Sequence, residues 1–234
     1  MTNKFPFLIA LIALVAFSCQ SADDGWKKLI VDDGISGWKV LGGQGLYNVE
    51  NGEVIGTTKG TSNTFLATEV PYENFILELE VLVDPKMNSG IQFRSNQNAK
   101  GAVNGYQAEI DPSERAWSGG LYDESRRGWL YPLTLNESGR KAFKNNQWNK
   151  YRIEAYQNNV QIWVNNVMTT HFQDSMATTG FIALQVHGVG TSEEEGLQVK
   201  WRNIRLKEQI ELKDLSEPLQ GVQLINLSQS QTGG

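Results

Sequence analysis

The sequence predicts an all-β fold, a two-sheet antiparallel sandwich, and three observations support this. Short segments alternate apolar and polar residues, which is the period of strands whose two faces meet different surroundings. Turn-forming pairs such as Asn51-Gly52 separate these segments and favour hairpins. Many short strands with regularly spaced turns are typical of sandwiches and jelly rolls, and the chain shows no βαβ alternation, P-loop, GxSxG or HExxH motif.

Composition narrows the class further. A length of 234 residues suits one domain, and 40% hydrophobic residues with seven Trp can fill its core. A net charge of −5 without any Lys/Arg cluster argues against a nucleic-acid partner. Two histidines are too few for a multi-histidine zinc site, and the lone cysteine, Cys19, excludes an internal disulfide.

We expect the N-terminal stretch to be a leader rather than part of the fold. Lys4 precedes a short apolar run over residues 5–17, which is typical of a signal peptide. Residues 16–19 (AFSC) resemble a bacterial lipoprotein box, in which the cysteine becomes the lipidated N-terminus. We expect Cys19 to anchor the protein in the bacterial cell envelope, its membrane contact being through the lipid only; an ordinary signal peptide with a chance cysteine is the alternative. The expected segments are a lipoprotein signal peptide over residues 1–18 and a tether over residues 19–24.

The rest of the chain alternates strands and turns. Residues 25–207 form the expected domain, and residues 208–234 are a polar, Gln/Ser-rich tail that we expect to be of low order. In the longest strand, 75–83, Glu78 and Glu80 alternate outward. The expected strands lie at residues 25–30, 37–40, 47–50, 53–56, 65–68, 75–83, 90–94, 105–111, 148–156, 160–164, 167–172, 180–187 and 197–206, and residues 117–122 are expected to turn into a further short strand.

Three of these strands, 90–94, 105–111 and 181–187, each carry polar residues on one side. If they lie in one sheet, their polar sides form a single surface. That surface would hold a guanidinium, two carboxylates, several amides and an imidazole, from Gln92, Arg94, Gln107, Glu109, Asp111, Gln185 and His187. The expected long loop at residues 126–132 (RRGWLYP) either covers the edge of the core or forms a sugar-binding rim from Arg126, Arg127 and Trp129.

Several of these motifs together resemble the 3-keto-disaccharide hydrolase domain family, in order over residues 25–207. The motifs are residues 88–94 (NSGIQFR), 105–111 (GYQAEID), 118–122 (SGGLY), 148–149 (WN), 180–187 (GFIALQVH) and 201–204 (WRNI). The resemblance implies a concanavalin A-like jelly roll in a secreted sugar-processing protein of bacteria. It also implies cleavage of glycosides that have been oxidised at C3, so that carbohydrate is the expected partner.

A ketone at C3 dictates the chemistry that such a site must perform. The ketone makes the C2 proton acidic, the aglycone on C1 then leaves by elimination, and water adds later. The site needs a base near neutral pKa, a cation at the enolate oxygen and an acid for the leaving oxygen. We expect His187 as the base and Arg94 as the cation. Glu109 or Asp111 would serve as the acid, orient His187, or hold a divalent ion, although the sequence requires no cofactor.

Further residues of the face and its rim are expected to bind the sugar. They are Gln92, Gln107, Tyr122, Arg126, Arg127, Trp129 and Gln185.

The same residues also have simpler, purely structural explanations. His187 would cap a sheet edge, and Arg94 with Glu109 would form a cross-strand ion pair and nothing more. Two other functions also fit the fold class. One is a non-catalytic, lectin-like carbohydrate-binding module. The other is an ordinary glycosidase that uses Glu109 and Asp111, which are about 7 Å apart by strand rise.

The leader gives the first testable prediction, that Cys19 is lipidated in the native protein. Mass spectrometry of the native N-terminus should show a chain that begins at a lipid-modified Cys19. An unmodified chain cut at another position would rule this out.

Overall fold

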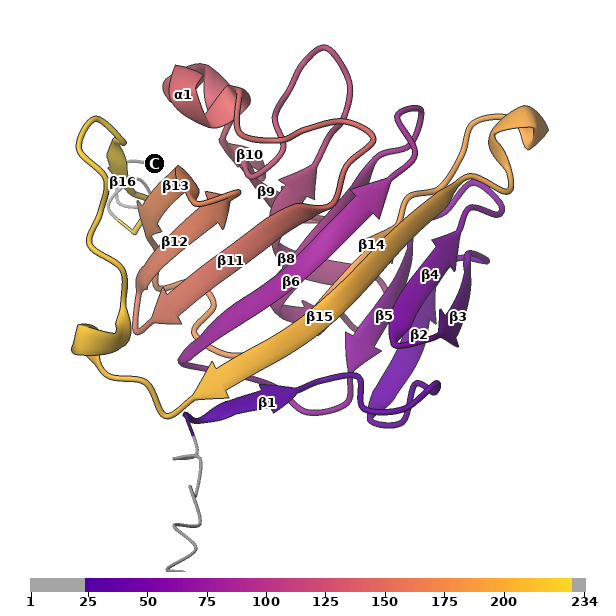
Figure 1. The fold of residues 1–234 in the computed structure, drawn as a ribbon, viewed down its shortest axis with the longest axis horizontal. Helices are drawn as coiled ribbons and strands as arrows, with labels where there is room; N and C mark the ends of the chain where they lie inside the picture. The colour runs from indigo at the N-terminus through magenta and orange to yellow at the C-terminus, as the bar shows by residue number, and fades with distance from the viewer. Residues whose placement is uncertain (1–23, 229–234) are drawn as a thin grey trace, which may run out of the picture.

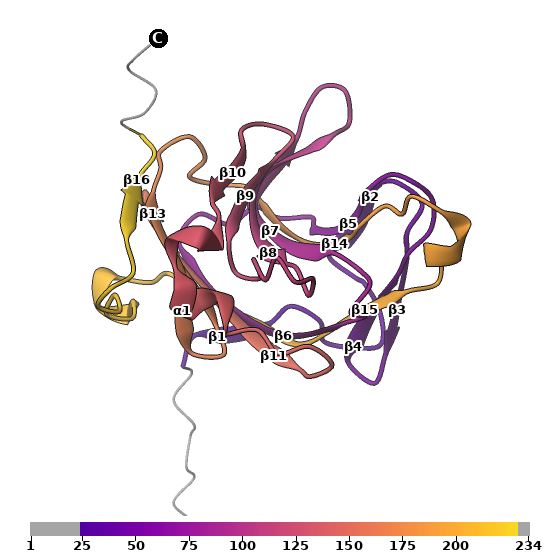
Figure 2. The same cartoon turned by 90° about the horizontal axis from the view of Figure 1, so that it is seen from above.

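The computed structural model describes residues 24–228, which form two β-sheets packed face to face (Figure 1, Figure 2). The predicted all-β sandwich is confirmed. The expected signal peptide, Cys19 and all of the tether but Asp24 lie outside these residues. Within residues 24–228, no helix is both long and apolar enough to cross a membrane.

The larger sheet, sheet A, has nine strands, and only its β13–β16 pair is parallel. Its strand β1 (Trp26–Lys28) pairs with β15 beside the main path. The other strands follow in the order β16 (Leu224–Asn226), β13 (Val167–Gln173), β12 (Asn159–Val164), β11 (Asn149–Tyr156), β6 (Phe75–Val83), β15 (Gln198–Glu208), β4 (Glu53–Thr57) and β3 (Leu46–Glu50).

The second sheet, sheet B, has seven antiparallel strands. They follow in the order β10 (Gly128–Tyr131), β9 (Leu121–Glu124), β8 (Val103–Ile110), β7 (Ser89–Gln97), β14 (Phe181–Val186), β5 (Thr64–Thr68) and β2 (Trp38–Gly42). The helical pieces of the described chain are all short: η1 (Leu133–Leu135), α1 (Glu137–Arg140), η2 (Ser192–Glu194) and η3 (Leu212–Asp214).

Strand alternation and turn chemistry explain these elements. Every odd-numbered residue of β6 joins the core, whereas Glu78 and Glu80 point outward as expected. The hairpin between β3 and β4 turns at Asn51-Gly52, whose φ angles of 52° and 75° both lie in the left-handed region that a type I′ turn requires.

A tyrosine joins the two sheets. Tyr47 of β3 in sheet A stacks on the fully buried Trp201, with ring centroids 6.4 Å apart. Its hydroxyl lies 2.8 Å from the carbonyl of Thr64 and 2.7 Å from that of Leu184, both in sheet B. These contacts fix the distance between the sheets beneath the site described below.

The face of sheet B that is turned away from sheet A is called the open face here. One end of it is apolar, where Val103, Phe181 and Ala183 pack together. Further along the same strands the side chains on the open face are polar. Asn63, beside β5, hydrogen-bonds Glu124 of β9, although three strands lie between β5 and β9. Sheet B is therefore strongly curved, and its open face is concave.

A β-bulge interrupts the alternation of β7 between Phe93 and Asn96. Arg94 takes a φ of 47°, in the left-handed region, and turns its side chain away from the open face. Ser95 then packs against Gly105 of β8, where a Cβ would lie 2.3 Å from the Ser95 hydroxyl oxygen. The bulge therefore depends on a residue without a side chain at position 105.

The C-terminal segment differs from its expectation as a tail of low order. Residues 209–228 fold back along sheet A and add β16 in parallel to β13. Ser216 bonds to the carboxylate of Glu154, and the Tyr131 hydroxyl donates to the Gln223 carbonyl. A polar composition did not prevent ordering, because the segment satisfies its polar groups against an existing sheet edge.

We predict that Gly105→Ala lowers the free energy of unfolding by about 2–4 kcal/mol, since it adds overpacking against Ser95 to a strained φ of 138°. Urea denaturation measures this change. The control is Gly101→Ala, at a φ of 82° with its nearest neighbour 3.8 Å away, which adds strain without a clash. Equal losses for the two variants would contradict the role of Gly105.

Candidate active site

A polar pocket of about 360 Å³ occupies the concave open face of sheet B. Strands β8, β9, β10 and β14 and the loops beside them supply its walls, so it combines segments that are distant in sequence. Its lining residues are Asn63, Asn88, Gln107, Glu109, Arg115, Tyr122, Glu124, Trp129, Gln185 and His187.

The carboxylate of Glu109 lies buried in this pocket, with 3% of its surface exposed. Its Oε1 accepts a hydrogen bond from the Asn88 amide at 2.5 Å, and its Oε2 accepts one from the Gln107 amide at 3.0 Å. Burial raises the pKa of Glu109 to about 7, and the two amide donors offset only part of that effect. Glu109 therefore populates both its protonated and its ionised form near neutral pH, whereas an ordinary carboxyl group is almost wholly ionised there.

A chain of hydrogen bonds between side chains holds Glu109 in place. The Ser95 hydroxyl donates to Gln92, the Gln92 amide donates to Gln107, and the Gln107 amide donates to Glu109, over 2.7, 2.7 and 3.0 Å. Gln107 lies over Gly90 of β7, where a Cβ would come within 2.3 Å of its side chain. The missing side chain at Gly90 therefore makes room for the residue that orients the carboxylate.

Arg115 is the cation of the pocket. Its guanidinium lies 4.8 Å from the ring centroids of both Trp117 and Trp129. Its Nε donates to Asp111 at 2.7 Å, and its Nη2 is 3.6 Å from Glu109 Oε1. The two rings and Asp111 thus orient a positive charge toward the carboxylate.

β14 and the residue that follows it supply two further groups. Gln185 is buried, and its Oε1 has no hydrogen-bond partner among the described residues although it lines the pocket. His187 is exposed at the rim, where its Nδ1 lies 2.6 Å from the Gly188 carbonyl. The pocket therefore offers an unused acceptor in its wall and an imidazole at its mouth.

The expectation that Arg94 shares this face is wrong. Its guanidinium donates from Nε and Nη2 to the Glu73 carbonyl at 2.8 and 2.6 Å, and from Nη1 to the Gln157 carbonyl at 2.7 Å. The bulge of β7 breaks the period-two alternation on which the expectation relied. Arg94 is therefore a fully buried structural residue and forms no ion pair with Glu109.

The expected rim is also corrected in part. Arg126 and Arg127 pair with Asp123, Arg127 also pairs with Asp174, and both lie over the Tyr106 ring at the edge of the core. They cover the core and do not line the pocket, because Asp123 points inward in the alternation of β9.

The other expected residues divide between the pocket and its surroundings. Gln107, Glu109, Tyr122, Trp129, Gln185 and His187 all line it. Gln92 lies fully buried behind Gln107, and Asp111 faces a neighbouring cavity, reaching the pocket only through Arg115.

Sequence reasoning missed Arg115, Asn63, Asn88 and Glu124 as pocket residues. Arg115 lies in an aperiodic loop, so no strand pattern marks its direction. Its one signal was the sequence of residues 115–117 (RAW), in which a cation stands beside an aromatic residue.

A second carboxylate shows what distinguishes Glu109. Glu78, on the outer face of sheet A, pairs with Lys150, Arg152 and Arg205 at 3.0, 2.8 and 2.5 Å. Although burial opposes it, this set of cations lowers the pKa of Glu78 to about 2. Glu78 therefore stays ionised and paired, and it has no use as a base at neutral pH. Within residues 24–228, no group of three or more His, Cys, Asp or Glu residues is arranged to hold a metal ion.

Comparison with known proteins agrees with the motifs. A family model described as a 3-keto-alpha-glucoside-1,2-lyase-like domain matches residues 25–207. This match confirms the resemblance drawn from the motifs and supports a carbohydrate-active function. No curated protein sequence matches the chain.

Solved structures show the same fold. A protein classed provisionally as a glycosyl hydrolase from Parabacteroides distasonis is 18% identical over 80% of this chain and 94% of its own, with a TM-score of 0.59. The carbohydrate-binding module CBM66 from Bacillus subtilis is 16% identical over 74% of this chain and 96% of its own, with a TM-score of 0.54. A Bacillus subtilis protein with a galectin-like fold is 10% identical over 78% of this chain and 94% of its own, with a TM-score of 0.56. At such identities the likeness shows the sandwich fold alone.

We predict that the two arginines have separable roles. Arg115→Gln should raise the pKa of Glu109 above about 7, because the variant removes a cation that favours the carboxylate. Arg94→Lys should leave that pKa unchanged and lower the free energy of unfolding by about 2–4 kcal/mol, since buried carbonyl acceptors lose donors. Carbon-13 NMR titration of Glu109 and urea denaturation measure the two quantities. A shift of the Glu109 pKa in Arg94→Lys would contradict this assignment.

Proposed function

Because the chain belongs to the 3-keto-alpha-glucoside-1,2-lyase-like domain family, we propose that its open-face pocket cleaves glycosides that carry a ketone at C3. The observation that supports this most directly is the buried carboxylate of Glu109, with a pKa of about 7, 3.6 Å from the Arg115 guanidinium. A base near neutrality beside a cation is the pair that proton abstraction next to a ketone requires.

In this proposal Glu109 is the base that removes the C2 proton. The Gln107 and Asn88 amides fix the plane of the carboxylate, so one orientation faces the pocket. His187, the base expected from sequence, stands exposed at the rim. A base that must act on a bound sugar ring is better placed in the wall than at the mouth, which favours Glu109.

Arg115 replaces Arg94 as the group that stabilises the enolate. As the C2–H bond breaks, its electron pair delocalises onto the C3 oxygen, and negative charge develops there. Asp111 and the Trp117 and Trp129 rings hold the guanidinium in a fixed position, so it need not reorganise during the reaction.

The leaving group departs toward the mouth of the pocket. The enolate electrons form the C1–C2 double bond, the C1–O bond breaks, and the aglycone oxygen takes up a proton. We assign His187 to that proton transfer, because an imidazole at the rim can donate to a group that leaves into solvent. Water then adds to the unsaturated keto sugar and completes a net hydrolysis.

Trp129 and Tyr122 supply the apolar contact for the sugar ring. Their rings meet edge to face with centroids 5.2 Å apart in the pocket wall. The unpartnered Gln185 Oε1 offers an acceptor to a sugar hydroxyl. Together they fit a pyranose, which has both an apolar face and equatorial hydroxyl groups.

A lectin-like module is the second candidate, because the same sandwich fold occurs in a carbohydrate-binding module. The raised pKa of Glu109 is the observation that favours an enzyme over a lectin. A glycosidase that uses Glu109 and Asp111 fits less well, since Asp111 lies outside the pocket and is engaged by Arg115 and Ser113.

We also propose that the expected lipid on Cys19 holds this activity in the bacterial envelope.

We predict that Glu109→Gln lowers kcat on a 3-keto-glucoside by ~10²–10⁴, with a smaller effect on KM, because it removes the base and keeps the shape of the pocket. In the wild type, kcat/KM should fall as the pH drops below about 7, since only the ionised Glu109 accepts the proton. Steady-state kinetics over pH 5–9 test both expectations, with Glu80→Gln on the outer face of sheet A as a matched control.

Isotope exchange separates the candidate functions. In deuterium oxide, elimination with reversible proton removal should place deuterium at C2 of recovered substrate, and hydrolysis at C1 should not. If the unoxidised glucoside is cleaved as fast as the 3-keto form and no label appears at C2, the protein is an ordinary glycosidase. If both sugars bind and neither is cleaved, the protein is a lectin-like module. If kcat falls further in His187→Ala than in Glu109→Gln, His187 rather than Glu109 is the base.

A further inference from the structure

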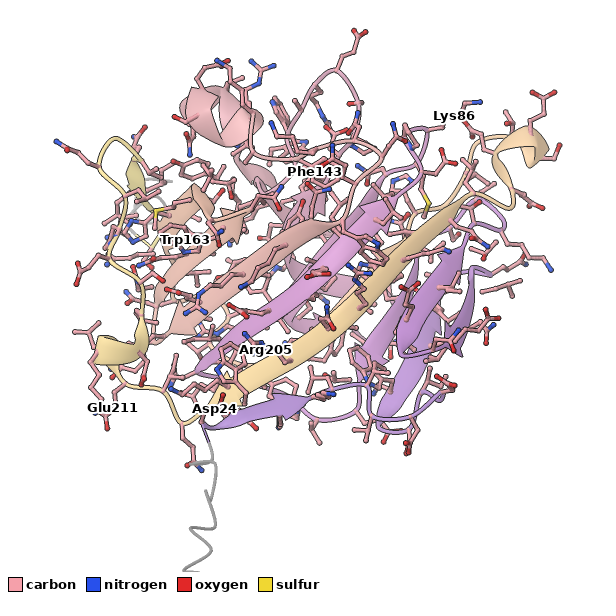
Figure 3. The ribbon with its side chains drawn as sticks, in the orientation of Figure 1. Asp24, Lys86, Phe143, Trp163, Arg205 and Glu211 are labelled. Atoms are coloured by element: carbon pink, nitrogen blue, oxygen red, sulfur yellow. The ribbon has the colours of Figure 1, made fainter. Side chains whose placement is uncertain are left out.

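A second cavity lies on the outer face of sheet A, away from the open face of sheet B. It has a volume of about 610 Å³. Its floor is β12 and β13, and its wall is the C-terminal segment that folds back along the sheet. Figure 3 labels Trp163, of β12, and Glu211, near the start of that segment. The cavity therefore exists only because the C-terminal segment is ordered.

An unused acceptor lies in the floor of this cavity. Gln161 of β12 is 2% exposed, and its Oε1 has no hydrogen-bond partner among the described residues. Glu154 on one neighbouring strand and His171 on the other flank it in register. Buried polar groups almost always have partners, so an unpartnered carboxamide oxygen in a cavity wall indicates a donor that comes from outside the chain.

His171 supplies a second acceptor beside it. It is 7% exposed, and burial lowers the pKa of its imidazole, which is therefore neutral at pH 7. Its Nε2 lies 2.9 Å from Oδ1 of Asn159, an acceptor, so Nε2 carries the proton. The remaining nitrogen, Nδ1, is then an acceptor with no hydrogen-bond donor among the described residues.

The lip of the cavity is apolar. Leu212 and Leu224 are 68% and 45% exposed, and both line the opening. Glu217 is the one carboxylate among the lining residues, and it stands on the C-terminal segment rather than in the floor. Acceptors in the floor disfavour an anion, and a wholly apolar ligand would leave both of them unpaired.

We propose that this cavity binds a neutral polyhydroxylated ligand, a sugar ring, through Gln161 and His171. Ligand hydroxyls donate to Gln161 Oε1 and His171 Nδ1, and the C–H face of the ring packs against Leu212 and Leu224. The site would hold a glycan on the face opposite the pocket of Glu109. This inference does not depend on the reaction proposed for that pocket.

The experiment uses the two histidines of the chain as reporters, since His171 lines this cavity and His187 lines the other pocket. Maltotriose and cellotriose, both neutral, are titrated into the protein while the imidazole resonances are followed by NMR. We expect the His171 resonance to shift in a saturable way. Gln161→Leu should weaken that response at least tenfold and leave any response of His187 unchanged.

Gln185→Leu is the matched control, because it removes the corresponding acceptor from the other pocket. It should leave the His171 response intact. If neither sugar moves His171, or if Gln161→Leu responds as the wild type does, the cavity holds water only and the proposal fails.

Two further measurements distinguish a lost binding site from a misfolded variant. Gln161→Leu should have an equal or higher Tm, because it removes a buried polar atom without a partner. A clear drop in Tm would mean that this oxygen is partnered within the fold, against the proposal. Leu212→Ser, at an exposed position, should weaken the His171 response severalfold without changing Tm.

Discussion

The pleat of sheet B is the constraint on which the rest of the structure depends. Each strand must fill the core with one side and present the other to the concave open face. On β8 the side chains of Tyr106, Ala108 and Ile110 pack into the core, so Gln107 and Glu109 are forced outward into the pocket. Residues that are far apart in the chain meet in the pocket because the core positions of their strands leave them no alternative.

Electrostatics then decides which carboxylate can act as a base. Glu78 and Glu109 are both buried glutamates on strands of the same sandwich. Three cations surround Glu78 and hold its pKa at about 2, whereas Glu109 has amide donors and one arginine 3.6 Å away, and its pKa is about 7. Burial raises the pKa in both cases; at Glu78 the paired cations outweigh this effect, and at Glu109, which lies deeper, the single arginine and the amides do not. Neutral amides orient a carboxylate without fixing its charge.

The two sheets thus carry different sites. Sheet B carries the proposed catalytic pocket on its concave face, while sheet A carries the ion pairs of Glu78 and, beyond β12, the cavity closed by the C-terminal segment. An unpartnered amide oxygen occurs in each of the two cavities, at Gln185 and at Gln161. In a chain whose family is carbohydrate-active, a sandwich with sugar sites on both faces could act on one part of a glycan while holding another.

The sequence by itself determined the sheet class, the turns and most of the polar face. Alternation and turn-forming pairs are local signals, so they predicted the strands, the hairpin at Asn51-Gly52 and the shared side of Gln107, Glu109 and Gln185. Only the tertiary structure decided the partners of the arginines. A bulge after Phe93 reversed Arg94, and a loop without periodicity brought Arg115 into the pocket. The pKa of Glu109 was also beyond sequence, because burial and nearby charges come from segments that only folding brings together.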